Sequence, residues 1–330
     1  MKKEVFMKKN IIRIAVTGGL GQIAYSLLFR LANGDVLGSD QQIALHILEV
    51  PFCKDALKGI VMELLDGCYP LLKEIVVGVD PEEVFENVDL ALLIGAKPRG
   101  EGMERKDLLI ENAKIFQKQG KALNDKASKD VKVLVVGNPC NTNCLIAMHN
   151  APDLKRENFH AMTFLDQNRA TSFLAKKTNS LVDDVQDVFI WGNHSATQVP
   201  DYFNAKVKDK YIKDLIDIGW LQNDFFEKVQ KRGSEIIKIR KKSSAGSAAQ
   251  AIIDFIKALF SSKRFSSAIC SDNNKYDIVD DLIFSFPVFS DNFGNCNIIE
   301  NLKFDAFLEE KIKITEKELL EEKDLIAHLL

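Results

Sequence analysis

The sequence predicts an α/β protein in which a doubly wound parallel sheet, covered by helices on both faces, is followed by an α+β domain. Three observations support this prediction: a glycine-rich turn between a strand and a helix near the N-terminus, alternating strand and helix patterns over the first half, and helices mixed with antiparallel-type strands in the second half. The rhythm changes near residue 150. We therefore expect a flexible N-terminal extension at residues 1–10, a first domain at 11–150 and a second at 151–330.

Apolar and β-branched segments predict the strands of the first half, with helices between most of them. These strands are expected at residues 11–17, 42–50, 73–79, 89–96 and 131–137. Ligands of parallel sheets bind beyond the carboxyl ends of the strands. The segments that directly follow these strands are therefore the best candidates for a functional site.

The second half predicts a mixed architecture that suits a substrate-holding domain. A helix is expected from Asp166 to Lys177, and strand patterns occur in DVFIWGNHS and TQVPDYFNAKV. The remaining elements are a long helical stretch from Asn223 to Phe260, strands near 266–271 and 281–289, and a charged terminal helix in TEKELLEEKDLIAHL.

Composition excludes several classes of protein. The 330 residues carry 44 basic and 47 acidic side chains, a net charge of −3 that gives no support to nucleic-acid binding. No window reaches the ~18 uncharged apolar residues of a membrane span, and no apolar core follows the basic start MKKEVFMKKN as in a signal peptide. The six cysteines form no CxxC motif and no metal-ligand set, so we expect no metal and free thiols in a reducing cytoplasm.

The segment IIRIAVTGGLGQIAYSLL, residues 11–28, predicts a strand, a tight turn and a helix. Gly19, Gly21 and Ala24 fit G-x-G-x-x-A, and Gly18 adds an overlapping G-x-x-G-x-x-A. Glycines bring backbone N–H groups close to a ligand, and a helix N-terminus favours a pyrophosphate. Glycines also form ordinary strand-to-helix turns, so this dinucleotide motif needs support from the next strand. The expected cofactor-binding residues here are Gly18, Gly19, Leu20, Gly21, Gln22, Ile23 and Ala24.

That support comes from Glu49, which ends the strand pattern of residues 41–50. A carboxylate at the end of the second strand of a βαβ unit binds the ribose hydroxyls of the adenosine and repels a ribose phosphate. It therefore predicts NAD rather than NADP as the cofactor. The alternative is that Glu49 simply lies at an exposed strand end.

Among the five histidines, His194 stands out because it follows a strand pattern and the residues WGN. A histidine at a strand end can act as a general acid/base, since its pKa lies near neutrality; the alternative is an ordinary polar turn residue. His46 lies inside an apolar strand and is expected to pack in the core. Solvated polar roles are expected for His149, His160 and His328.

Charged residues in two other segments complete the candidate site. LDQNR places Asp166 and Arg169 on one face of a helix, where the carboxylate can orient an imidazole and the arginine can bind a substrate carboxylate. The alternative is an N-cap aspartate with an exposed ion pair. Arg99 and Arg105 flank a glycine-containing loop that suits a dianionic substrate, or else are solvated surface cations.

Five segments occur in an order that resembles the cytosolic-type, dimeric malate dehydrogenase group of the lactate/malate dehydrogenase superfamily: TGGLGQIAYSLL, PRGEGMERKDLL, VVGNPCNTNC, LDQNRA and IWGNHSATQ. The resemblance covers residues from about 11 to 325. It implies reversible NAD-dependent hydride transfer between (S)-malate and oxaloacetate in the tricarboxylic acid cycle. It also implies an NAD-binding Rossmann first domain, a homodimer and a cytoplasmic location.

The resemblance implies roles for individual residues as well. His194 takes the hydroxyl proton, and Asp166 orients and stabilises it. Arg169 holds the carboxylate next to the reacting carbon, Arg99 holds the distal carboxylate, and Arg105 polarises the carbonyl oxygen. Further cofactor contacts are implied at Asn112, Gln119, Val136, Gly137 and Asn138, the last of which also contacts the substrate.

Arg99 favours malate over lactate, because the similar lactate dehydrogenases carry a neutral glutamine at the corresponding loop position. An unpaired arginine in a closed site costs several kcal/mol. The sequence departs from the family pattern at Glu49, where Asp is usual, at Gly100, which replaces a second arginine, and at Gly246, where Met is usual. Two alternatives stay open: another 2-hydroxy acid dehydrogenase such as lactate dehydrogenase, and a catalytically silent nucleotide-binding relative.

Overall fold

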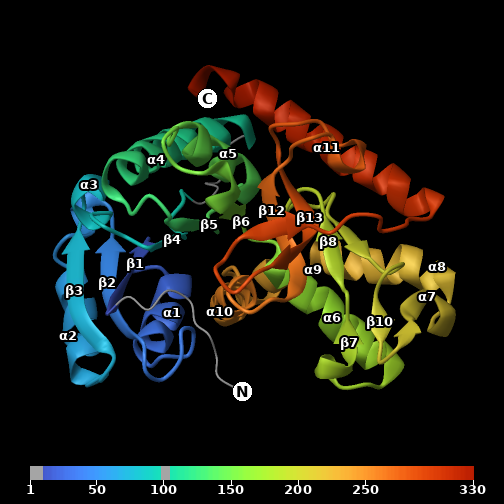
Figure 1. The fold of residues 1–330 in the computed structure, drawn as a ribbon, viewed down its shortest axis with the longest axis horizontal. Helices are drawn as coiled ribbons and strands as arrows, with labels where there is room; N and C mark the ends of the chain where they lie inside the picture. The colour runs from blue at the N-terminus through green and yellow to red at the C-terminus, as the bar shows by residue number, and fades with distance from the viewer. Residues whose placement is uncertain (1–9, 98–104) are drawn as a thin grey trace.

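The computed structural model describes residues 10–97 and 105–330, excluding the side chains of residues 105 and 106. Within these residues one large sheet runs through the centre of the molecule in the order β14-β13-β12-β6-β5-β4-β1-β2-β3 (Figure 1). Of the predicted extension at residues 1–10, only Asn10 belongs to the described part of the chain.

Six strands form the parallel part of this sheet: β1 (Ile11–Thr17), β2 (Gln42–Leu48), β3 (Leu72–Gly78), β4 (Leu90–Leu93), β5 (Lys132–Val135) and β6 (Phe159–Ala161). Their order, β3-β2-β1-β4-β5-β6, reverses direction between β1 and β4, as in a doubly wound dinucleotide-binding sheet. The predicted fold class is therefore confirmed, as are the first five predicted strands to within a few residues at their ends. The parallel part continues through β6 beyond residue 150, where the sequence predicts the end of the first domain.

Helices cover both faces of the parallel strands. The helices of this half are α1 (Gln22–Ala32), α2 (Leu57–Asp66), α3 (Pro81–Val84), α4 (Arg105–Lys126) and α5 (Cys140–His149). Side chains that alternate along a strand enter opposite cores: Ile14 and Val16 of β1 pack in the core of α1 and α10 (Gly246–Leu259), whereas Ala15 packs in the core of α4 and α5. These two layers lie below and above the strands in Figure 1. Strands that are buried on both faces explain the nearly continuous apolar sequences from which they were predicted.

The second half adds antiparallel strands to the same sheet. β12 (Arg264–Cys270), β13 (Ile283–Ser290) and β14 (Cys296–Ile298) pair in succession, and β12 joins β6 through Ala268 and Ala161. Two small sheets lie beside them. One contains β7 (Val185–Gln186), β10 (Lys206–Val207) and β11 (Lys210–Tyr211), and the other contains β8 (Phe189–Trp191) and β9 (Val199–Asp201).

The helices of the second half correct two predictions. The helical stretch expected from Asn223 to Phe260 is interrupted at Lys241, which has a φ of +57° and ends α9 (Phe226–Arg240) before α10 begins. The terminal helix α11 (Ala306–Ile326) starts well before the predicted segment, because the Asp305 side chain caps it by accepting a hydrogen bond from the Leu308 N–H. The helix predicted at 166–177 is confirmed as α6 (Phe164–Thr178).

Shorter helical segments complete the described chain: α7 (Ile212–Leu215), α8 (Ile218–Trp220), a π-helical turn at Leu221–Phe225, and 3₁₀ turns at Pro51–Cys53, Arg156–Asn158, Val182–Asp184, Lys275–Asp277 and Ala327–Leu329. No helix in the described part of the chain is long and apolar enough to cross a membrane. Among the described residues, no group of three or more His, Cys, Asp or Glu could hold a metal ion.

Candidate active site

The glycine turn between β1 and α1 has the geometry predicted for it. Gly18 has a φ of +67°, and a Cβ added there would lie 2.7 Å from the Cα of Gly95 at the end of β4. A Cβ added to Gly19 would lie 2.1 Å from Cγ2 of Ile47. Both positions therefore require glycine, and they bring the main chain and the N-terminus of α1 to the carboxyl edge of the sheet, where an anionic ligand is favoured.

Glu49 lies one residue beyond β2 and is tied to this turn. Its Oε2 accepts a hydrogen bond from the Leu20 N–H at 3.1 Å, and its Oε1 accepts one from the Val50 N–H at 2.9 Å. The side chain is half-buried. The carboxylate thus lies against the glycine turn, where it can accept hydrogen bonds from a ribose, rather than at a fully exposed strand end.

The other predicted cofactor residues have varied surroundings. Asn112 is fully buried: its Oδ1 accepts from the Lys97 N–H at 2.8 Å, and its Nδ2 donates to the carbonyls of Lys97 and Leu108 at 3.2 and 3.1 Å. In this structure its amide holds the main chain after β4. Gln119 is also buried, and its Oε1 has no hydrogen-bond partner among the described residues.

After β5 the chain passes through the next three predicted cofactor residues. Val136 is half-buried, Gly137 is buried and Asn138 is exposed, and the Asn138–Pro139 peptide bond is cis. Gly246, where the family pattern has Met, begins α10, and an added Cβ there would meet no atom within 4 Å.

Most of the predicted arginine loop lies outside the described residues. Arg99 and Gly100 lie outside the described residues, and Arg105 is described only as the first residue of α4. The roles given to both arginines stay predictions.

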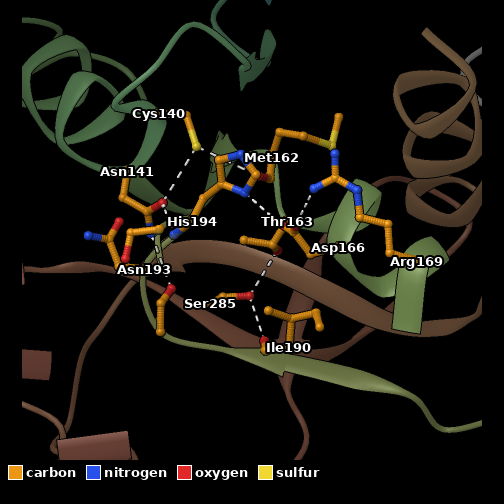
Figure 2. A network of polar contacts seen from close by, with 12 residues as sticks. Cys140, Asn141, Met162, Thr163, Asp166, Arg169, Ile190, Asn193, His194 and Ser285 are labelled. Atoms are coloured by element: carbon orange, nitrogen blue, oxygen red, sulfur yellow. Dashed lines mark hydrogen bonds and ion pairs between the residues drawn. The ribbon is translucent and has the colours of Figure 1, made fainter. Parts of the chain in front are cut away.

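The structure brings His194, which follows β8, together with Asp166 and Arg169, which both lie on α6 (Figure 2). His194 Nδ1 forms a hydrogen bond with Asp166 Oδ2, and Arg169 Nη1 donates to Asp166 Oδ1 at 2.9 Å. Asp166 lies inside α6 and Thr163 is the N-cap residue, so the N-cap alternative for Asp166 is wrong. With Nδ1 engaged, Nε2 is the ring nitrogen that can exchange a proton with a substrate.

The electrostatics of this group favour a charged carboxylate. Asp166 is fully buried, and burial by itself raises its pKa. The charge and hydrogen bond of His194, together with those of Arg169, outweigh burial and hold the pKa of Asp166 below its usual value. An ionised Asp166 stabilises the imidazolium that forms when His194 takes up a proton.

Asn141 is a member of the site to which the sequence assigned no role. Its Oδ1 accepts from the His194 N–H at 3.0 Å (Figure 2). Its Nδ2 donates to the carbonyl of Ile283 at 2.8 Å and to that of Gly192 at 3.3 Å. A single buried amide thus connects α5, the turn after β8 and strand β13. A usable signal was present in CNTNC, because consecutive polar residues in a helix that is buried on all sides need internal partners.

Two further buried polar side chains, Ser285 and Thr163, connect the strand before His194 with the helix that carries Asp166. Ser285 on β13 donates from its Oγ to the Ile190 carbonyl at 2.7 Å, and its Oγ lies 2.8 Å from Thr163 Oγ1. These contacts connect β8, which precedes His194, with the start of α6, which carries Asp166 (Figure 2).

The remaining histidines divide into confirmed and corrected predictions. His46 is buried with Nδ1 2.7 Å from the Val84 carbonyl oxygen, which confirms a packing role, and His328 is exposed. His149 is half-buried with Nε2 2.9 Å from Asp281 Oδ1. The solvated role predicted for His160 is wrong: this residue is fully buried in β6, because β12 covers the edge that the parallel strands would otherwise leave open.

A doubly wound sheet with a glycine turn, followed by a histidine paired with a buried aspartate, defines the class of nucleotide-binding oxidoreductases. Two family models agree with this assignment. The lactate/malate dehydrogenase NAD binding domain matches residues 12–160, and the lactate/malate dehydrogenase alpha/beta C-terminal domain matches residues 163–330. The chain therefore belongs to the lactate/malate dehydrogenase family.

Similar proteins of known name include two malate dehydrogenases. The malate dehydrogenase of Protochlamydia amoebophila is 56% identical over 97% of this chain and 98% of its own length. The chloroplastic malate dehydrogenase [NADP] 1 of Sorghum bicolor is 51% identical over 97% of this chain and 76% of its own length. The name malate dehydrogenase thus recurs among relatives, and the name of the Sorghum bicolor enzyme specifies NADP.

Solved structures include both branches of the family. A malate dehydrogenase from Naegleria fowleri aligns with a TM-score of 0.93 and 44% identity over 97% of this chain and 99% of that chain. The Trichomonas vaginalis lactate dehydrogenase in complex with NADH and oxamate aligns with a TM-score of 0.92 and 36% identity over 96% of this chain and 98% of that chain. Overall similarity alone therefore does not choose between malate and lactate.

Proposed function

We propose that the protein is an NAD-dependent malate dehydrogenase that catalyses (S)-malate + NAD⁺ ⇌ oxaloacetate + NADH + H⁺. The observation that carries this proposal is the pairing of His194 with the buried Asp166, next to Arg169. The 56% identity with a relative named malate dehydrogenase supports the choice of substrate.

In the proposed reaction His194 Nε2 takes the hydroxyl proton of malate as the carbon becomes a carbonyl. Asp166 keeps the ring oriented through Nδ1 and stabilises the imidazolium. Arg169 binds the carboxylate next to the reacting carbon with two parallel hydrogen bonds, for which it exchanges its contact with Ser244 Oγ at 3.3 Å. By resemblance, Arg99 binds the distal carboxylate and Arg105 polarises the carbonyl oxygen.

The described residues fit a bound dinucleotide. Side chains at Gly18 and Gly19 would clash with Gly95 and Ile47, so these glycines let the turn pack closely on the sheet. The N-terminus of α1 that follows the turn favours a pyrophosphate. NAD supplies the hydride acceptor when it is bound. The proposed cofactor residues are Gly18, Gly19, Leu20, Gly21, Gln22, Ile23, Ala24, Glu49, Asn112, Gln119, Val136, Gly137 and Asn138.

The preference for NAD rests on Glu49. Its carboxylate lies at the glycine turn, where the 2′-phosphate of NADP would meet a like charge. The NADP-type relative from Sorghum bicolor makes this the point of the proposal that most needs measurement.

We further propose a cytoplasmic homodimer that acts in the tricarboxylic acid cycle, by resemblance to the cytosolic dimeric group. Met62 and Leu65 on α2 are exposed at 63% and 62%, and such apolar side chains suit a contact between two subunits. Light scattering during size-exclusion chromatography tests the subunit count.

Lactate dehydrogenase activity is the second candidate, because a lactate dehydrogenase is among the similar structures. Loss of NADH absorbance with oxaloacetate and with pyruvate, repeated with NADPH, separates the two activities. A protein that binds NADH but consumes it with neither substrate would be the silent relative.

Arg99→Gln sharpens this assay. Removing the positive charge for the distal carboxylate should lower kcat/KM for oxaloacetate about 100-fold or more, while turnover of pyruvate holds or rises. Equal losses on the two substrates would contradict the role of Arg99 in substrate choice.

A further inference from the structure

One face of α11 forms hydrogen bonds with the turn that carries His194. The proposed mechanism assigns no role to this helix. Thr315 Oγ1 accepts a hydrogen bond from the Asn193 N–H at 2.9 Å, and it lies 2.9 Å from Thr197 Oγ1. These two contacts lie on either side of His194 along the chain.

Glu318 binds the same turn one helical turn further along α11. Its Oε2 accepts hydrogen bonds from Asn193 Nδ2 at 3.0 Å, from Thr197 Oγ1 at 2.6 Å and from Ser195 Oγ. A carboxylate oxygen can serve several donors at once because it carries charge and has no proton of its own to place. The side chains immediately before and after His194 therefore share one acceptor.

Glu322 extends this contact to a second segment of the site. Its Oε1 accepts from Asn193 Nδ2 at 3.2 Å, and its Oε2 accepts from Thr142 Oγ1. Thr142 follows Asn141, whose side chain accepts the His194 N–H. Glu322 thus connects the His194 turn with Thr142, the neighbour of the residue that binds the main chain of His194.

The position of these acids argues for a role beyond packing. Residues 315, 318 and 322 are spaced three and four apart, so they share one face of α11. Thr315 is fully buried and Glu322 is 3% exposed. Glu318 is half-buried. Burying the Glu322 carboxylate is costly and an apolar side chain would pack as well, so the hydrogen bonds to the turn are the physical reason for an acid at that position.

We propose that Glu318 and Glu322 are positioning residues that hold residues 193–197 so that the His194 imidazole stays against Asp166. They act through the turn and do not touch substrate or cofactor. The inference rests on the proposed function, because it assigns part of the turnover rate to the C-terminal helix.

Glu318→Ala tests the inference because it removes both acceptor oxygens. Glu318→Gln keeps one acceptor oxygen and is expected to have a smaller effect. We expect kcat with oxaloacetate to fall about 10- to 100-fold in the alanine variant and less in the glutamine variant, because a displacement of about 1 Å at a catalytic group has this effect. The dissociation constant of NADH, from fluorescence titration, should stay within about twofold. Glu321→Ala is the matched control, since Glu321 is a neighbouring acid of α11 whose side chain is 67% exposed.

Several outcomes are distinguishable. If Glu318→Ala folds with a lowered melting temperature but keeps the parental kcat, the role is structural only and the proposal is overturned. If Glu318→Ala does not fold, Glu322→Gln replaces it, because it keeps the size of the side chain and removes one acceptor of the pair. A parental kcat in folded Glu322→Gln then overturns the proposal.

A second readout does not depend on turnover. The Nδ1 proton shared between His194 and Asp166 should give a strongly downfield proton NMR signal, which should weaken or disappear in Glu318→Ala and persist in Glu321→Ala. An inactive parent protein would contradict the proposed function alone, and the NMR comparison would still decide the positioning role. An unchanged signal together with unchanged kcat would overturn the positioning role alone.

Discussion

The two halves of the site are built in different ways. The centre of the proposed nucleotide half, residues 11–49, is one continuous region that relies on main-chain groups, on the absence of side chains at Gly18 and Gly19, and on one carboxylate. The histidine half assembles His194 and Asp166 from separate segments and holds them with buried hydrogen bonds. Substitution cannot remove main-chain groups, so we expect the histidine half to depend far more on individual side chains.

His194→Asn should produce the largest effect. It removes the proton acceptor, so kcat should fall about 1000-fold, within the range typical of general acid–base catalysis. Binding of NADH should be unchanged because the nucleotide half is untouched. Steady-state kinetics and fluorescence titration check both statements, and His328→Asn, at an exposed position, is the control. Normal turnover in His194→Asn would remove this residue from the mechanism and abolish the contrast between the two halves.

Glu49→Ser should produce a smaller, more selective effect. Loss of the carboxylate beside Leu20 removes repulsion of a 2′-phosphate, so the ratio of kcat/KM for NADPH to that for NADH should rise about tenfold. The maximal rate with NADH should change little. Glu86→Ser, at an exposed position, should leave the ratio as in the parent. If kcat of Glu49→Ser fell as much as that of His194→Asn, the nucleotide half and the histidine half would not act independently.

His160→Gln should leave turnover at pH 7 nearly unchanged and alter only the pH dependence of stability. Burial lowers the pKa of His160 from 6.5 to about 3, and the nearby Lys132 acts in the same direction. Between pH 6.5 and about 3, His160 therefore binds a proton in the unfolded chain but stays neutral in the folded protein. Protonation favours the unfolded state, so the stability contributed by neutral His160 is lost as the pH falls through this range. When the pH is lowered from 7 to 5, the free energy of unfolding of the parent should decrease more than that of the variant. The difference between the two decreases should be about 2 kcal/mol.

The matched control for this prediction is His328→Gln, because His328 is exposed. Denaturant titrations at the two pH values measure the difference. Glutamine keeps a hydrogen-bonding group near Ser267 Oγ, which lies 2.9 Å from His160 Nδ1, but it cannot take up a proton. Equal pH dependence in parent and variant would show that His160 titrates at its ordinary pKa.

Local features of the sequence determined the strand, glycine turn and helix at 11–28, the alternating elements up to residue 137, and the histidine at the end of β8. Each of these depends on side-chain periodicity or on backbone freedom within a few residues, so it is readable along the chain. The sequence also indicated Asp166 and Arg169 as one helical face.

Only the tertiary structure decided how distant segments meet. β6 has three residues, too few for a periodic pattern, and it became a central strand because β12 pairs with it from about 100 residues away. That pairing buried His160. The contacts of Asn141 and of Glu318 and Glu322 likewise join segments that are far apart in the chain. Hydrogen bonds of this kind depend on the meeting of two surfaces, and neither segment alone specifies its partner.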